Sequence, residues 1–244
     1  MPLARASELD RLLACSGSAW LHRAESRSGI AAAWGTKVHS WAETGQLPAG
    51  LDGVALEKRI KASETSRLAL WPEDGQREVA MAYNVVRNIA TTCTSTEPGY
   101  KDRWKAAFDD EWITGTCDYV ADVFGDPWVD DLKTGRQVHW KDYEAQQSFY
   151  VLAWCMADRG ELVQSRSTIT HWPRYPVAVK PNRFGTTLDV EYLMLFRGKL
   201  QHLRTEILAG RQQPEIGLLF TGDQCKYCPS RGTCPKLSAQ EEQN

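Results

Sequence analysis

Apolar residues recur at helical spacing along much of the chain. Near the N-terminus, Ser7 stands where a capping hydroxyl is expected, and leucines three and four residues apart lead to Cys15, so a short amphipathic helix is predicted there. An apolar stripe from about Asp142 to Asp158 predicts a second, buried helix. The same spacing predicts further helices at about 35–43, 54–70, 76–92 and 189–209.

A different periodicity, the alternation of apolar and polar residues, fills the middle of the chain. It runs from about Trp112 to Thr134 with a break at Gly125-Asp126-Pro127 and predicts a β-hairpin; a further strand is expected at Ser167–Trp172. This order of elements predicts an α/β fold with a small mixed central β-sheet flanked by helices. The tail from Gln224 onward is too polar to fold alone, so it needs docking or a metal to hold it.

The turn of the hairpin decides which side chains meet. With a two-residue turn at Gly125-Asp126, where glycine supplies the positive φ of a type II′ turn, Asp118 is expected to face Lys133. Asp131 then projects from the same side of the sheet, because alternate residues share a face. A three-residue turn that includes Pro127 would move Asp118 to the opposite face unless a bulge restored it.

Length and composition suit one folded domain over residues 1–244. The chain is 42% hydrophobic and 25% charged, as is typical of a globular protein, and its formal net charge of -2 means that any contact with nucleic acid needs a local basic patch. It contains neither an apolar run of about 18 to 20 residues, as a membrane span requires, nor the apolar core of a secretion signal. We therefore expect a cytoplasmic protein without a membrane partner.

The acidic hairpin suggests a metal site. Two carboxylates held close together repel each other unless a cation lies between them, and their hard oxygen ligands suit Mg²⁺ or Mn²⁺. Lys133 beside such an ion could polarise an attacking water or stabilise charge on a phosphate. The alternative is an exposed cross-strand ion pair worth about 0.2–1 kcal/mol.

Further motifs lie on either side of the hairpin in a family order. Gly35-Thr36-Lys37-Val38-His39 precedes it and Gln146-Gln147-Ser148-Phe149-Tyr150 follows it. In this arrangement the chain resembles the RecB-like nucleases of the PD-(D/E)XK superfamily, which implies a restriction-endonuclease-like core and a divalent-metal-dependent DNA nuclease. The resemblance implies His39, Asp118, Asp131 and the Leu132 carbonyl as metal ligands, and Asp118, Asp131, Lys133, Gln146 and Tyr150 as catalytic residues.

Two details depart from the family pattern. No proline precedes Asp118, and Asp131 stands where many relatives have glutamate, although neither change removes a ligand. Asp130 is a competing candidate, but alternation places it on the face opposite Lys133.

The cysteines suggest a second metal centre. Cys225, Cys228 and Cys234 lie within ten residues, and Cys15 could supply a fourth ligand from the end of the first helix. Four thiolates fit either a structural zinc ion or a 4Fe-4S cluster, and the resemblance to the iron–sulfur members of the RecB-like nucleases favours iron. Residues 1–30 and 210–240 would then form one cluster-binding region. Cys93, Cys117 and Cys155 are interpreted as buried apolar residues.

The expected substrate is DNA, single-stranded or with free ends, with Lys37, Arg136 and Lys141 as candidate phosphate contacts. The resemblance favours an exonuclease of recombination, repair or phage or CRISPR-related processing. Two alternatives stay open, a non-catalytic DNA-binding subunit of a recombination or CRISPR-adaptation complex and a zinc-containing interaction protein.

Overall fold

A computed structural model of the chain describes residues 1–21, 30–44, 71–94, 99–135, 137–172, 182–213, 219–222, 225 and 228–237. Its centre is a seven-stranded mixed sheet in the order β3-β2-β4-β5-β6-β7, with β1 paired to β4 off this path. The strands are β1 (Ala4–Arg5), β2 (Gln76–Asn84), β3 (Ile89–Cys93), β4 (Trp112–Val123), β5 (Asp126–Lys133), β6 (Ser165–His171) and β7 (Asn182–Leu188). Of the six strand pairings, β1–β4 and β5–β6 are parallel, and the other four are antiparallel.

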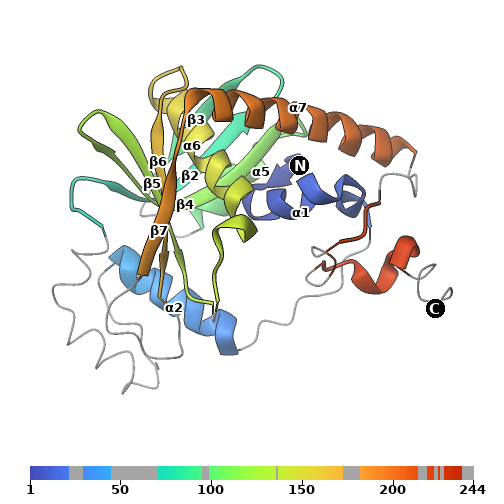
Figure 1. The fold of residues 1–244 in the computed structure, drawn as a ribbon, viewed down its shortest axis with the longest axis horizontal. Coiled ribbons are helices and arrows are strands. Elements are labelled where there is room, and N and C mark those ends of the chain that lie inside the picture. The colour runs from blue at the N-terminus through green and yellow to red at the C-terminus, as the bar shows by residue number, and fades with distance from the viewer. Residues whose placement is uncertain are drawn as a thin grey trace.

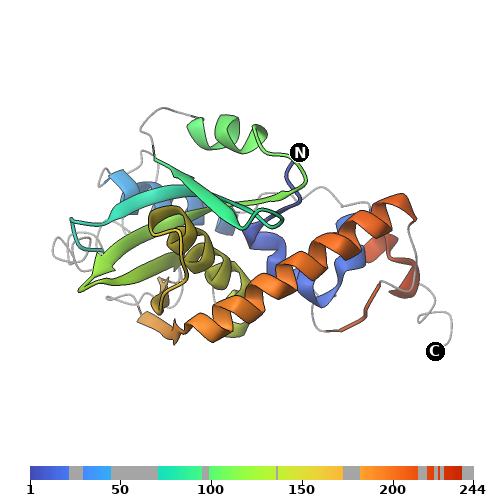
Figure 2. The same cartoon turned by 90° about the horizontal axis from the view of Figure 1, so that it is seen from above.

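Helices cover both faces of the sheet. They are α1 (Leu9–Ala14), α2 (Ile30–Thr44), α5 (Tyr100–Ala106), α6 (Glu144–Asp158) and α7 (Val190–Gln212), with short 3-10 turns at Ala6–Glu8, Ser16–Ala19, Trp140–Asp142 and Arg231–Thr233. Figure 1 shows α7 along one side of the sheet and α2 across the other, and Figure 2 shows α5 on the β2 side, away from α7. The expected α/β fold, a mixed sheet flanked by helices, is confirmed.

Two apolar cores lie on the two faces of the sheet. The larger one joins α1, α6 and α7 to one face, where Phe149 and Leu152 of α6 are fully buried against strand residues such as Met81. The smaller one joins α2 to the other face, where Trp41 packs edge-on against Trp172 with ring centroids 5.1 Å apart. The functional motifs on α2 and α6 are therefore held against opposite faces of the same sheet.

The segment 76–92, which the sequence predicts to be helical, forms the antiparallel strands β2 and β3 instead. The reason is visible in its buried positions, since Val79, Met81 and Tyr83 alternate and enter one core. Asn84 accepts hydrogen bonds from the amides of Val86 and Arg87 and so directs the turn between the strands. The predicted helix at 54–70 lies outside the described residues.

The hairpin of β4 and β5 forms with a register different from the predicted one. Its turn is Phe124-Gly125, both at positive φ (57° and 92°), and not Gly125-Asp126. Val120 therefore pairs with Val129, whereas the predicted turn would have paired it with Asp131. The change moves the register by two positions along β5, and a shift by two keeps every side chain on its original face.

No helix within the described part of the chain combines the length and apolar character that a membrane span requires.

Candidate nuclease site on three central strands

Three carboxylates from adjacent strands form a row across the sheet. The pairings on either side of Glu78 place it opposite Asp118 of β4. Because Tyr119 pairs with Asp130, Asp118 in turn lies opposite Asp131 of β5. Asp118 is buried and accepts a hydrogen bond from the Leu132 amide at 2.6 Å. The predicted direct pairing of Asp118 with Lys133 is thus wrong, because Asp131 occupies the neighbouring position.

Strand β4 changes face at this row. Cys117 packs into the core under α6, whereas Tyr119, two residues on, packs into the core under α2. In a regular strand these two side chains would share a face. Opposite the change, Glu78 of β2 has a positive φ of 52°, a conformation that L-residues rarely adopt and that, inside a strand, is a recognised feature of functional sites.

Helix α2 brings His39 to the row. Its Nδ1 lies 3.1 Å from Asp118 Oδ1. Burial lowers the pKa of His39, but the neighbouring Asp118 carboxylate outweighs burial and raises it to about 9. The helix can approach this closely because residue 35 is glycine: a Cβ atom there would lie 2.9 Å from Thr134 Oγ1.

On the other side of the row, Lys133 links the strands to α6. Its ammonium forms an ion pair with Asp131 and donates to Gln146 Oε1 at 3.4 Å, while Gln146 Nε2 donates to Tyr150 Oη at 2.8 Å. Lys133 Nζ also lies 4.6 Å from the centre of the Tyr143 ring. The lysine is therefore held by a carboxylate, an amide and an aromatic face.

The pKa values of the three carboxylates shift in different directions, raised for Asp131 and Glu78 and lowered for Asp118. Burial raises the pKa of Asp131 to about 6 despite Lys133, and burial together with Asp118 raises that of Glu78 to about 7 despite Lys101. Burial acts on Asp118 in the same direction, but His39 and the other contacts hold its pKa below the ordinary value. Carboxylates that repel one another in this way are suited to bind a cation.

Glu78 and Asp118 of the row, together with His39, line a pocket of about 520 Å³ that suits a hard divalent ion. Ligand atoms of His39, Glu78 and Asp118 lie within 4.8 Å of one another. The buried hydroxyl of Thr116 also lines the pocket and has no hydrogen-bond partner among the described residues. Nitrogen and oxygen ligands grouped in this way fit Mg²⁺ or Mn²⁺. The lining residues are Gly35, Thr36, His39, Ser40, Glu43, Glu78, Lys101, Thr116 and Asp118.

Glu78 and Lys101 line the pocket but are not among the site residues predicted from the sequence. Neither belongs to a local motif, and Glu78 lies in a segment predicted to be helical. Of the candidate phosphate contacts, Lys37 is half-buried on α2 and Lys141 is exposed in the 3-10 turn before α6. The third, Arg136, lies outside the described residues.

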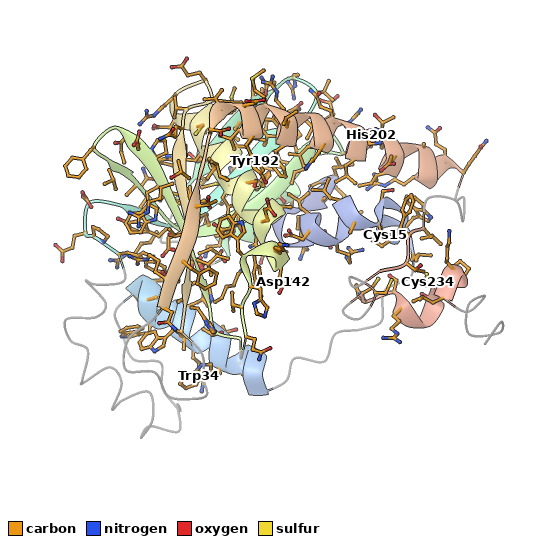
Figure 3. The ribbon with its side chains drawn as sticks, in the orientation of Figure 1. Cys15, Trp34, Asp142, Tyr192, His202 and Cys234 are labelled. Carbon is orange, nitrogen blue, oxygen red and sulfur yellow. The ribbon has the colours of Figure 1, made fainter. Side chains whose placement is uncertain are left out.

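Three of the four candidate cluster cysteines meet around one short segment. Cys15 and Cys234 are buried together with Leu219, and Figure 3 shows the two labelled cysteines near each other at one end of the molecule. The amide of Phe220 donates to Cys15 Sγ at 3.4 Å, and Cys225 Sγ donates to the Phe220 carbonyl at 3.9 Å. The fourth, Cys228, follows in the turn after Cys225 and donates its amide to the carbonyl of that residue at 3.4 Å.

Comparisons with known proteins concern nearly the whole chain. Residues 6–235 match the family model described as the PD-(D/E)XK nuclease superfamily. A solved structure titled "Crystal structure of SSO0001" is similar with a TM-score of 0.41 and 12% sequence identity, over 96% of this chain and 86% of that chain. No curated protein matches the chain.

Proposed function

Since the chain belongs to the PD-(D/E)XK nuclease superfamily, we propose that it is a divalent-metal-dependent nuclease that hydrolyses phosphodiester bonds in DNA. The match of residues 6–235 to the family model confirms the superfamily that the sequence motifs predicted. The observation that carries the proposal is the arrangement of Asp118, Asp131 and Lys133 beside His39. Of these residues, His39 and Asp118 line a pocket that is open to solvent.

The proposed ligands of the ion are His39, Asp118, Asp131 and the main-chain carbonyl of Leu132. When bound, Mg²⁺ or Mn²⁺ would lower the pKa of a water molecule and polarise the phosphate. Lys133, held by Asp131 and Gln146, would orient the attacking water or stabilise charge on the phosphoryl oxygens. Tyr150 would act through Gln146 by fixing the orientation of its amide.

As to substrate and cutting mode, we propose an exonuclease that works from DNA ends, because the motif order resembles the His-containing RecB-like branch. Single-stranded ends fit a protein whose net charge is only -2, since a strand can be guided by a local basic patch such as one including Lys37, Lys141 and Arg136. A role in recombination, repair or CRISPR-related processing, with partner proteins, follows from the same resemblance.

The test is cleavage of end-labelled single- and double-stranded DNA by purified protein with Mg²⁺ or Mn²⁺. Wild-type protein should degrade the substrate, Asp118→Ala and Lys133→Ala should not, and the exposed β4 variant Asp122→Asn should behave as wild type. The product ladder gives the polarity. Intact DNA under every condition would reject the free-standing enzyme and favour a binding subunit that needs a partner.

We also propose that Cys15, Cys225, Cys228 and Cys234 hold a 4Fe-4S cluster, with zinc as the alternative. Burial of Cys15 beside Cys234 and the amide hydrogen bond to Cys15 Sγ support a shared centre, since hydrogen bonds to thiolates are a feature of such sites. Such a cluster would close a loop of about two hundred residues and anchor the polar tail.

Anaerobically purified protein should contain about four iron atoms per chain, as a 4Fe-4S cluster requires. Cys15→Ser should lose the iron, whereas Cys93→Ser, a half-buried residue of β3, should retain it. Zinc in place of iron would reject the cluster and keep the four-cysteine site. Retention of iron by Cys15→Ser would reject Cys15 as a ligand.

A further inference from the structure

A second lysine–carboxylate pair lies in the pocket, opposite the one that contains Lys133. Lys101, at the start of α5, forms an ion pair with Glu78. The neighbouring Tyr100 donates its hydroxyl to the main-chain carbonyl of Glu78 at 2.6 Å. Helix α5 thus holds both the backbone and the side chain of Glu78, at the residue with the positive φ of 52°.

The two pairs flank Asp118 from its two neighbouring strands. On β5 the carboxylate is Asp131 with its partner Lys133, and on β2 it is Glu78 with its partner Lys101. Both lysine side chains are only partly accessible, 19% for Lys133 and 29% for Lys101. Lys101 therefore lies beside Asp118 on the β2 side, in a position that corresponds to that of Lys133 on the β5 side.

We propose that Lys101 is a second phosphate-binding lysine that takes the place of a second divalent ion, so that the site holds one ion. The inference rests on the proposed nuclease function. In this proposal the Lys101 ammonium supplies the positive charge that a second ion would otherwise supply on the Glu78 side of Asp118. Its ammonium would bind a non-bridging oxygen of the phosphate in the pocket, as a compact point charge does.

The lining of the pocket supports a single ion. Lys101 lines the pocket together with His39, Glu78 and Asp118. Its ammonium therefore lies inside the pocket, beside the carboxylate that a second ion would need as a ligand.

Competition for the Glu78 carboxylate gives the same result. A Glu78 oxygen already lies within 4.8 Å of the ligand atoms of His39 and Asp118, so its position would suit an ion ligand. The Lys101 ammonium binds this carboxylate, and an ammonium and a divalent ion a few ångströms apart repel each other strongly in a partly buried site. Removal of the Lys101 charge should therefore open a second ion site.

The experiment counts bound Mn²⁺ by isothermal titration calorimetry and by electron paramagnetic resonance. Wild-type protein should bind one ion in the pocket, Lys101→Met two, and Lys101→Arg one, because arginine keeps the charge. Lys105→Ala is the control, since Lys105 lies one turn further along α5 and outside the pocket lining. With DNA, Lys101→Met should be slower by about 10²–10³-fold at low Mn²⁺ and should depend sigmoidally on its concentration.

Two bound ions in the wild-type pocket, or one in Lys101→Met with unchanged cleavage, would overturn the inference. If Lys101→Met does not fold, the number of ions bound by wild-type protein still tests the inference, because two bound ions would overturn it. Failure of the nuclease proposal looks different: wild-type protein would leave DNA intact with every metal, whereas the ion counts of the variants would still decide the role of Lys101.

Discussion

His39 Nδ1 lies 3.1 Å from Asp118 Oδ1, and this contact joins α2 to the central strand across 79 residues of sequence. The pair is the point at which the helix motif and the strand motif meet. If both side chains bind the ion, His39→Ala should weaken Mn²⁺ binding at least about tenfold, measured by calorimetry. His202→Ala is the control, because that histidine is 75% exposed on α7 and pairs with Glu206. Equal affinity of His39→Ala and wild type would remove His39 from the ligand set.

Tyr150→Phe tests the positioning of Lys133 through Gln146. The hydroxyl of Tyr150 accepts the Gln146 amide at 2.8 Å, and without it the amide loses the contact that orients its oxygen toward Lys133. We expect about tenfold slower DNA cleavage and a loss of about 1 kcal/mol in the free energy of unfolding. Tyr192→Phe removes a comparable hydroxyl bound to Ser148 of the same helix and should leave the cleavage rate unchanged. The positioning role would be wrong if both variants cleaved at the wild-type rate.

Gly115→Ala should destabilise the fold by about 1–3 kcal/mol, measured by urea unfolding. A Cβ atom at residue 115 would lie 2.7 Å from Ala6 Cβ and 2.8 Å from Tyr150 Cε1, so β4 and α6 would have to separate. Gly198→Ala is a control of opposite sign. It lies inside α7 with open space around the added carbon, and alanine should stabilise the helix by up to about 1 kcal/mol. Equal stability of the two variants would contradict the close packing at Gly115.

Asp10 should make stability depend on pH. Its carboxylate accepts the amides of Ala145 and Gln146 at the start of α6, and burial raises its pKa from 3.8 to about 6 despite these bonds. A carboxyl that binds its proton more tightly in the folded chain stabilises the fold below its unfolded pKa, and this contribution falls as pH rises through about 6. It amounts to at most about 3 kcal/mol.

The measurement compares wild type with Asp10→Asn by urea unfolding between pH 4 and pH 7. The asparagine cannot ionise, so the stability of wild type relative to the variant should decrease over this range. An increase instead would show that the amide hydrogen bonds outweigh burial and that the pKa of Asp10 is depressed.

Local motifs predicted much of the site because each one specifies a short piece of geometry. Gln146 and Tyr150 are four residues apart on one helix, so their contact follows from the spacing. The face shared by Asp118 and Asp131 survived the wrong choice of turn, since Phe124-Gly125 and Gly125-Asp126 differ by a two-residue register step.

Pairing between distant segments could not be predicted in the same way. Glu78 reaches the site only because β2 pairs with β4, and Lys101 only because α5 folds back onto β2. The alternation in 76–84 was obscured by alanines, which favour a helix over a strand. The positive φ of Glu78 is likewise imposed by the surrounding structure, and a glutamate in the sequence does not predict it.

The first fifteen residues have consequences for the order of folding. Leu3 donates its amide to the Trp112 carbonyl, Asp10 binds the first turn of α6, and Cys15 accepts the amide of Phe220. Each of these contacts spans more than a hundred residues, so this segment is synthesised well before the partners that it binds. High contact order of this kind slows folding, and we expect the candidate site to assemble only after synthesis has passed the C-terminal cysteines.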